Sequence, residues 1–389
     1  MDFALNEQHE LLRDSAREFV TAEMPLLALL KEPDPLTAPQ YEASWSKIVD
    51  LGWQGLVIPA DLGGVGMDEL DLSMIVAELG RGLALCPFIG NLYGTWAILR
   101  AGSEDQQRKI LPAVAAGEIR LALAALDPNL DKDGNPVVAN SNGAQTTLTG
   151  RAPFVIDGFG ADHLVVAAQR SEGGEALYLV NANQPGVAAS PLDWRDVSRR
   201  VAAVSFNEAQ ATRLADDSAD VWPWIRDRIV LTQATENLGG MRQILDTTVD
   251  YTKERVAFGR PIGANQSIKQ GLAEILGQIT GGDAITLYAA GRIAAGAEDG
   301  WRAAALAKGY TGDRYVEAAR TSIQYFGAIG CTWEMPNHVY LKRAIANVAM
   351  FGSPRQHRVR AMEWFRGDVR RRYAAGDIPV APLAGRLFL

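Results

Sequence analysis

Two segments in the last third of the sequence combine residue types that suit the binding of a dinucleotide. Arg255 supplies a permanent, forked cation that matches a pyrophosphate, and Phe258 can cover the edge of an aromatic ring. Gln266 and Gln324 can each donate and accept hydrogen bonds, and Gly327 lets a ligand approach the backbone closely. Taken singly, Arg255 could instead complement a helix dipole, and Gln324 could be a polar core residue with satisfied hydrogen bonds.

One carboxylate, Glu236, lies upstream in a segment with helical periodicity. The apolar stripe of that segment consists of Val230, Ala234, Leu238, Met241 and Leu245. Glu236 is expected on the other side of the helix, near Ile229 and Gly240. The adjacent glycines would let a bulky ligand come close. The alternative is a solvated or helix-capping acid on an exposed face.

Other common kinds of catalytic centre find no support in the sequence. The four histidines show no H-x-x-x-H or H-E-x-x-H pairing, so no metal site is expected. Cys86 and Cys331 lie far apart, and both are expected to be buried thiols in a reducing cytoplasm. The net charge of −8 argues against nucleic acid as a partner. No apolar run reaches the ~18 residues of a membrane span, and the N-terminus does not resemble a secretion signal.

The elements that must position these residues fall into three blocks, because 389 residues exceed what one hydrophobic core holds. Helical periodicity covers 7–20, 41–51, 70–83 and 106–116. Short β-branched or apolar runs follow at 121–125, 146–148, 163–168, 176–181 and 201–206. Long helical segments return at 225–254, 266–297, 301–326 and 337–365.

This order predicts an α+β fold with an N-terminal helical domain (1–118), a middle β domain (119–215) and a C-terminal helical domain (216–389). The middle domain is expected to be a small antiparallel barrel or sandwich. Short loops in the last domain favour an antiparallel four-helix bundle.

The two C-terminal segments resemble signatures of acyl-CoA dehydrogenases. Tyr251–Gln266 is similar to that family's Y-x-x-x-R-x-x-F-G-x-x-I-x-x-x-Q motif. Gln324–Glu334, followed by Leu341–Ala344, is similar to Q-x-x-G-G-x-G-Y-x-x-E and L-x-R-D/A. The resemblance covers nearly the whole chain and implies FAD as cofactor, contacted by Arg255, Phe258, Gln266, Gln324, Gly327 and Ala328. In the family, residues of the Arg255 and Gln324 type serve the FAD of a neighbouring subunit, which implies at least a dimer.

The sequence departs from the family in the segments that usually contact the flavin ring and at the positions that usually carry the catalytic acid. Ala125–Asp131 and Pro153–Gly158 replace the usual flavin-contacting segments of the β domain. Phe351 replaces the glutamate of a Y-E-G-T-like turn, and Ile229 stands at the other position that some members use for the acid. The chain instead resembles a sub-branch with A-x-E-x-x-G-G, here around Glu236, and G-S-x-x-x-H-R, here Gly352–Arg358. That branch includes bacterial enzymes that act on steroid side-chain CoA esters, often as two unlike subunits.

The resemblance implies α,β-dehydrogenation of an acyl-CoA thioester. A carboxylate with a raised pKa in a desolvated site removes the α-proton, and hydride passes to FAD. Glu236 is the candidate base, and Asp227 and Arg228 are candidate substrate contacts. The implied partners are an electron-transferring flavoprotein and further subunits, either in a homo-oligomer or in a heterotetramer with a related chain.

Two alternatives stay open at this point. The chain could be a non-catalytic partner subunit that supplies Arg255 and Gln324 to the flavin of an unlike neighbour, as the Phe351 replacement favours. It could also be a related flavin enzyme of the same fold, such as a nitroalkane oxidase or a flavin hydroxylase.

Overall fold

The N-terminal block is a group of helices packed around one apolar core. The computed structural model describes residues 5–26, 31, 39–125, 137–142 and 145–374. Its first helices are α1 (Glu7–Glu23), α3 (Pro39–Asp50), α4 (Glu69–Gly82), α5 (Phe88–Ala101) and α6 (Glu104–Ala115). Side chains of Asn6, Asp68 and Ser103 cap α1, α4 and α6 by accepting hydrogen bonds from backbone amides. Helix α5 was not predicted from the sequence, because it is buried nearly all round and therefore shows no amphipathic period.

Within the described residues, the middle block is a closed sheet of seven strands: β1 (Leu121–Ala124), β2 (Val138–Asn142), β3 (Gln145–Ile156), β4 (His163–Arg170), β5 (Glu175–Asn181), β6 (Val187–Pro191) and β7 (Val201–Arg213). The strands run in the order β1-β4-β2-β3-β7-β5, and β5 also pairs with β4, which closes the sheet into a small barrel. Two expectations need correction. β2 and β6 were missed, and β4 pairs in parallel with β1 and β2, so the sheet is mixed.

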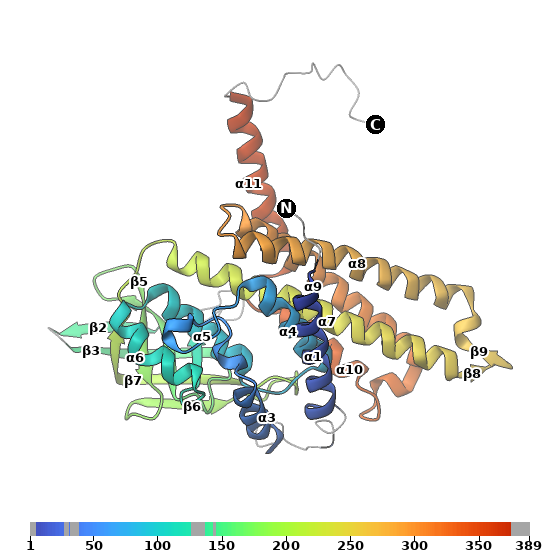
Figure 1. Cartoon of the computed structure of the whole chain (residues 1–389), viewed down its shortest axis with the longest axis horizontal. Coiled ribbons are helices and arrows are strands. Elements are labelled where there is room, and N and C mark those ends of the chain that lie inside the picture. Colours follow the sequence, from blue (N-terminus) through green and yellow to red (C-terminus); the bar gives the residue numbers. More distant parts are fainter. Residues whose placement is uncertain (1–4, 27–30, 32–38, 126–136, 143–144, 375–389) are drawn as a thin grey trace.

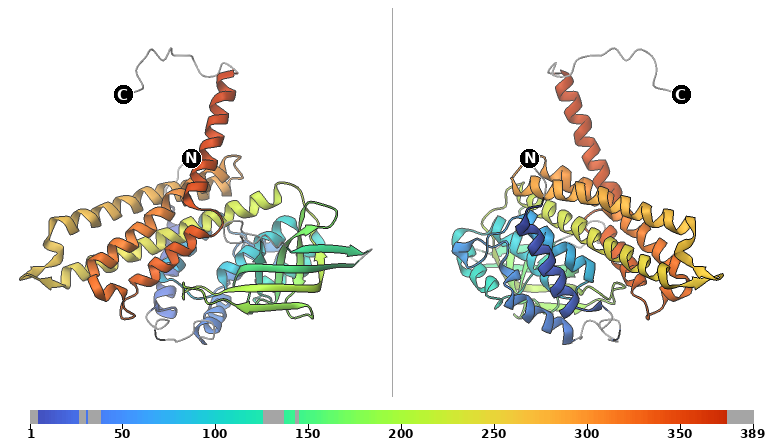
Figure 2. Two further views of the ribbon diagram at one scale, coloured as in Figure 1. Left: turned by 180° about the vertical axis from the view of Figure 1, so that it is seen from behind. Right: turned by 45° about the vertical axis from the view of Figure 1, so that its right-hand side comes forward.

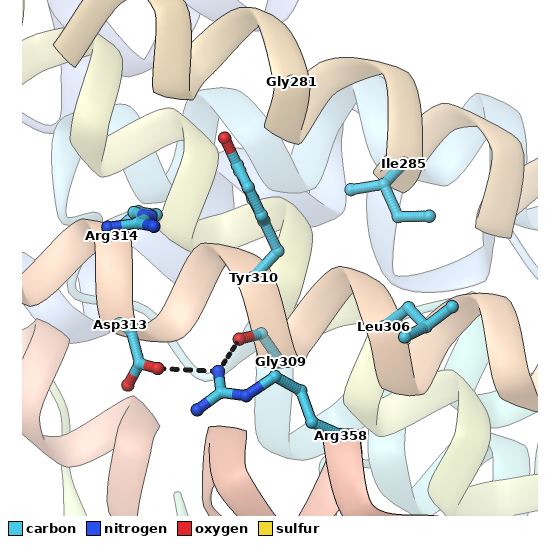
Figure 3. A pocket seen from close by; sticks show the side chains of 8 residues that line it. All are labelled: Gly281, Ile285, Leu306, Gly309, Tyr310, Asp313, Arg314 and Arg358. Carbon is cyan, nitrogen blue, oxygen red and sulfur yellow. Dashed lines mark hydrogen bonds and ion pairs between the residues drawn. The ribbon is translucent and has the colours of Figure 1, made fainter. Parts of the chain in front are cut away.

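The C-terminal block consists of long helices that lie side by side (Figures 1 and 2). They are α7 (Val221–Glu254), α8 (Gln266–Ala294), α9 (Gly300–Phe326), α10 (Asn337–Ala349) and α11 (Pro354–Ala374). The single helix expected over 337–365 is wrong, because the chain turns at Phe351 and Gly352, both with positive φ, before Pro354 starts α11. The overall α+β fold of helices, barrel and bundle is confirmed. A groove lined by residues of α8, α9 and α11 lies on one face of the bundle (Figure 3).

Helix α7 joins the blocks, because it packs against both α4 and α9. At the crossing with α4 two glycines allow the backbones to touch. A β-carbon on Gly239 would lie 1.8 Å from the carbonyl oxygen of Ala77, and one on Gly80 would lie 2.4 Å from that of Glu236. The glycines beside Glu236 therefore serve helix packing, rather than the approach of a ligand suggested by the sequence. Among the described residues, no helix is both long and apolar enough to cross a membrane.

Candidate functional site

The tip of the bundle is a tight hairpin that follows α7. It consists of β8 (Val256–Ala257) and β9 (Arg260–Pro261), with Phe258 and Gly259 at the turn, both at positive φ. Phe258 is fully exposed, at 104% of its reference area. A non-glycine residue at positive φ is uncommon, and this one holds an aromatic ring away from its own protomer. Arg255, at the end of α7, is also exposed and forms no ion pair with any described residue.

The second predicted segment lies at the same end of the bundle. Tyr251 of α7 stacks on Phe326 of α9, with ring centroids 3.9 Å apart, and the Tyr325 hydroxyl donates a hydrogen bond to the Ser267 carbonyl at the start of α8. Gly327 adopts φ 68° and ψ −145°, a conformation that suits glycine. The structure therefore gathers at one end the six residues predicted to contact the cofactor, all exposed: Arg255, Phe258, Gln266, Gln324, Gly327 and Ala328.

These residues suit a dinucleotide held outside this protomer. An unpaired guanidinium can form charge-assisted hydrogen bonds to phosphate oxygens, and an exposed aromatic ring can cover a heterocycle. Because these side chains are exposed, a dinucleotide bound here would be covered by this protomer on one side only.

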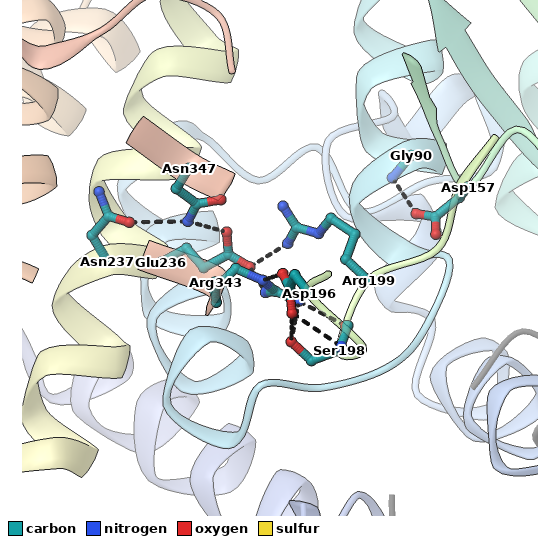
Figure 4. A network of polar contacts seen from close by, with 9 residues as sticks. All are labelled: Gly90, Asp157, Asp196, Ser198, Arg199, Glu236, Asn237, Arg343 and Asn347. Atoms are coloured by element: carbon teal, nitrogen blue, oxygen red, sulfur yellow. Dashed lines mark hydrogen bonds and ion pairs between the residues drawn. The ribbon is translucent and has the colours of Figure 1, made fainter. Parts of the chain in front are cut away.

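Glu236 lies in a buried charge network between α7, α10 and the loop that precedes β7 (Figure 4). Its carboxylate accepts hydrogen bonds from Arg199 and from Arg343, the latter at 2.6 Å. The Asn347 side-chain amide donates a third, at 3.0 Å. Arg343 also donates through Nε to Asp196 at 2.5 Å and through Nη2 to the Ser198 carbonyl at 2.6 Å. Two carboxylates and two guanidinium groups thus neutralise one another.

The electrostatics of this network differ from what the sequence suggested. Burial on its own would raise the pKa of Glu236, but the charges of Arg199 and Arg343 and the hydrogen bond from Asn347 outweigh it and lower the pKa. The expectation of a raised pKa is therefore wrong, and so is the alternative of a solvated acid, since Glu236 is 3% exposed. Whether Glu236 acts as a base stays a prediction.

A narrow cavity lies where the β domain meets the helices. Its lining residues are Tyr93, Leu123, Ala125, Phe154, Ile156, Met350 and Phe351. Its free volume of about 10 Å³ is on the scale of a single water molecule. Phe351 fills the space by packing edge-on against Tyr93, with ring centroids 5.9 Å apart.

The turn that carries Phe351 is held from two sides. Lys308, fully buried in α9, donates hydrogen bonds to the carbonyls of Asn347 at 2.9 Å and Met350 at 2.6 Å. Nε2 of His357 lies 2.9 Å from the Phe351 carbonyl. Burial lowers the pKa of His357 to about 4, so the ring is neutral near pH 7 and donates through Nε2. The space that the described residues leave in this cavity is far smaller than a flavin ring.

The predicted substrate contacts lie at the other end of α7 from the tip. Asp227 pairs with Arg360 at 3.4 Å. Arg228 pairs with Glu69 at 2.6 Å and lies over the Trp224 ring. Along the helix, Arg228 is about 40 Å from Arg255, and Glu236 is about 28 Å from it. Within one protomer, the structure therefore keeps the predicted cofactor contacts, the predicted base Glu236 and the predicted substrate contacts apart. The roles of Asp227 and Arg228 remain predictions.

Sequence reasoning missed the partners of Glu236. Arg343 belongs to the segment Leu341–Ala344, whose similarity to the family pattern gives no sign of a contact with Glu236. Arg199 and Asp196 precede a strand in a polar segment that shows no period. A second correction concerns the thiols: both are free, but Cys331 is exposed and Cys86 alone is buried.

Asp157 gives a testable pH dependence near this region. Its buried carboxylate accepts hydrogen bonds from the Tyr41 hydroxyl at 3.1 Å and the Gly90 amide at 2.9 Å. Burial raises its pKa to about 6, although the charge of Arg199 opposes the shift. A raised pKa means that the fold favours the protonated acid, so this stabilisation is full below pH ~4 and is lost as the pH rises through 6.

We therefore expect Asp157→Asn to gain stability relative to the wild type between pH 4 and 7, by roughly 2–3 kcal/mol. Urea unfolding of both proteins across this range measures the difference. Glu236, whose lowered pKa makes stability fall with acidification, is present in both proteins and cancels. A difference that stays constant with pH would contradict the assignment.

Comparisons with known proteins bear on the family and the fold of this chain. The family model described as the N-terminal domain of acyl-CoA dehydrogenases matches residues 6–118, and the C-terminal domain model matches residues 228–362. Acyl-CoA dehydrogenase IpdE2 of Mycobacterium tuberculosis is 30% identical over 81% of this chain and 84% of its own length. The ChsE4–ChsE5 complex from Mycobacterium tuberculosis aligns with a TM-score of 0.81 and 26% identity, over 98% of this chain and 100% of that chain. The Tcur3481–Tcur3483 steroid ACAD aligns with a TM-score of 0.83 and 25% identity, over 94% and 99%.

Proposed function

This chain belongs to the acyl-CoA dehydrogenase family, and from that premise we propose that it works as one of two unlike subunits of an FAD-dependent dehydrogenase. The protein is an acyl-CoA dehydrogenase, an oxidoreductase whose cofactor is FAD. In the proposed assembly its bundle tip binds part of an FAD whose flavin ring is held by the neighbouring subunit. When bound, FAD supplies the hydride acceptor of the reaction.

One observation carries the proposal: the residues suited to the dinucleotide face outward, while the chain's own cavity is filled. Arg255 and Phe258 are exposed at the tip. Phe351 closes the cavity near Tyr93, where about 10 Å³ remains. This combination favours a chain that completes a neighbour's site over one that holds a flavin ring in this cavity.

Each residue at the bundle tip would contact a different part of the cofactor. Arg255 would pair with the pyrophosphate as a forked cation. Phe258 would cover an aromatic ring of the dinucleotide, and Gln266 and Gln324 would form hydrogen bonds with its polar edges. Gly327 and Ala328 would let it approach the backbone, since neither has a long side chain.

The unlike subunit would then supply the flavin pocket and the base for the α-proton. The names of similar proteins support this division, because the ChsE4–ChsE5 and Tcur3481–Tcur3483 structures each pair two chains. They also support a bulky, steroid-type acyl group on the CoA thioester, since one of them is a steroid ACAD. We further propose that an electron-transferring flavoprotein is the acceptor and that the assembly works in the cytoplasm. Asp227 and Arg228 would contact the substrate under the second candidate function, in which this chain carries its own active site.

A second candidate is an enzyme that works on its own with Glu236 as base. The observation in its favour is that two arginines keep this buried carboxylate ionised, as a base requires. The same contacts count against it, because a carboxylate that accepts three hydrogen bonds has little affinity left for a substrate proton.

Glu236→Gln in the assembled complex separates the two functions. If the chain is a non-catalytic subunit, we expect kcat per bound flavin to stay within a few-fold of wild type and the free energy of unfolding to fall, because Arg199 and Arg343 lose their counter-charge. Rapid-reaction kinetics and urea unfolding measure both. Glu78→Gln is the matched control, since Glu78 is also buried and paired with an arginine, Arg17, but lies on α4. A loss of turnover of 10²-fold or more with flavin still bound would make Glu236 the base.

A further inference from the structure

The turn between α10 and α11 holds Phe351 in a backbone conformation that its residue type disfavours. Phe351 has φ 54° and Gly352 has φ 99°. The left-handed region costs a non-glycine residue about 1 kcal/mol or more, and an aromatic side chain has no polar group with which to offset that cost locally. The ring nevertheless lines the narrow cavity and packs edge-on against Tyr93. Contacts made by other residues must therefore fix this turn.

The carbonyls on both sides of the Phe351 α-carbon are each bound by a buried side chain of another helix. Lys308 of α9 donates to the Met350 carbonyl at 2.6 Å. His357 of α11, with its neutral ring, donates through Nε2 to the Phe351 carbonyl at 2.9 Å. The φ and ψ of a residue are set by the orientations of the two peptide groups that flank it. Anchoring both carbonyls therefore fixes the backbone of Phe351, and with it the direction in which the ring points.

The burial of Lys308 shows how much this anchoring costs. Its side chain is 0% exposed, and a buried ammonium group is tolerated only where its donors are bonded. It also donates to the side chain of Gln233 and to the Asn347 carbonyl, the latter at 2.9 Å. Asn347 and Met350 lie at the end of α10, where helical carbonyls lack partners within the helix. Lys308 thus binds the carbonyls that lead into the turn.

Inside the cavity, the closed turn leaves one polar group without a partner. The Tyr93 side chain is 2% exposed, and its hydroxyl forms no hydrogen bond with any described residue. An unsatisfied buried hydroxyl costs about 1–3 kcal/mol. On the other side of the turn, His357 packs so closely that a β-carbon on Gly352 would lie 2.7 Å from its Nε2. The two anchors therefore hold the turn closed against a strained residue and an unsatisfied hydroxyl.

We infer that Phe351 is an autoinhibitory plug, and that Lys308 and His357 form the latch that keeps it in the cavity. Without the latch, the backbone of Phe351 relaxes to negative φ, where most residues lie, and the ring leaves the space beside Tyr93. The plug excludes an apolar, flat ligand, because the rest of the lining is apolar: Leu123, Ala125, Phe154, Ile156 and Met350. The inference rests on the proposed function in one respect, that the chain leaves this cavity unused.

Fluorine NMR of the full chain with 4-fluorophenylalanine at position 351 tests the latch. The wild type is expected to give one resonance. Lys308→Met and His357→Leu are each expected to add a second resonance, at the chemical shift of an exposed ring, with about a fifth or more of the signal. The matched controls are Lys269→Met, at an exposed position of α8, and His338→Leu, which packs on Trp333 at the start of α10. Both controls should keep the single resonance.

Benzene measures whether the cavity opens. Phe351→Ala leaves a space the size of one phenyl ring, so saturating benzene should raise its Tm by about 2–5 °C. The latch variants should show a rise of similar size, whereas the wild type and the controls should not respond. If Lys308→Met does not fold, His357→Leu decides alone.

Three results would overturn the inference. One is a single resonance and no response to benzene in the latch variants. The second is a wild type that already shows two resonances or binds benzene. The third is a Phe351→Ala protein that does not bind benzene, since the plug would then close no site. These experiments contain no flavin and no second polypeptide, so their outcome is separate from the test of the proposed function.

Discussion

Replacing Arg343 by methionine is expected to lower the free energy of unfolding by about 3–5 kcal/mol, among the largest effects of any single substitution in this chain. Arg343 is fully buried and hydrogen-bonds to Asp196, Ser198 and Glu236 at once. Methionine fills a similar space but leaves two carboxylates buried near each other with one guanidinium, Arg199, to balance them. Chemical unfolding monitored by tryptophan fluorescence measures the loss.

Arg320→Met is the matched control, because Arg320 is an exposed arginine on α9. It should change stability by no more than about 0.5 kcal/mol. The double variant Arg343→Met/Glu236→Gln should cost less than the sum of its parts, since residues in one charge network are not additive. Equal effects of the Arg343 and Arg320 substitutions would show that the network does not hold the β domain to the bundle.

Replacing Arg255 by glutamine is expected to weaken FAD binding by the assembled complex about 10–100-fold, because one charge-assisted contact to a phosphate is worth about 1.5–3 kcal/mol. The stability of the chain should not change, since Arg255 is exposed. Titration of the apo complex with FAD, followed by flavin fluorescence, measures the affinity.

Lys253→Gln is the control, because it also removes one positive charge, two residues away. It shows how much of the effect comes from the overall electrostatic potential of the bundle tip. Lys253 is exposed and lies near Asp250, at 3.7 Å, so its loss should leave the affinity for FAD within about two-fold. If the two variants bind FAD equally well, Arg255 does not grip the pyrophosphate.

The sequence predicted those elements that have one face on the core and the other in solvent, because only such elements show a hydrophobic period. α1 and α6 show a strong apolar period and were predicted within a few residues. α5 was missed because both of its faces are buried. β6 was missed because it is a short edge strand with mostly exposed residues. The break between α10 and α11 needed the positive φ values of Phe351 and Gly352, which hydrophobic period does not encode.

In the candidate site, contacts between residues close in sequence could be predicted, and contacts between residues far apart in sequence could not. The tip residues follow from spacing, because Arg255, Phe258 and Gln266 belong to one continuous helix end and hairpin. The surroundings of Glu236 could not be predicted, since Arg199 is 37 residues away and Arg343 is 107 residues away in sequence. The sign of a pKa shift depends on such distant charges. The sequence could therefore identify the acid but not the direction in which its pKa is shifted.

The visible spectrum of the purified chain tests the central claim, that this protein completes an FAD site which it cannot form unaided. The chain expressed alone is expected to be folded and colourless, and to acquire a flavin spectrum, bleached by acyl-CoA, when the unlike subunit is co-expressed. A yellow protein that forms without any second polypeptide and is bleached by an acyl-CoA thioester would contradict it.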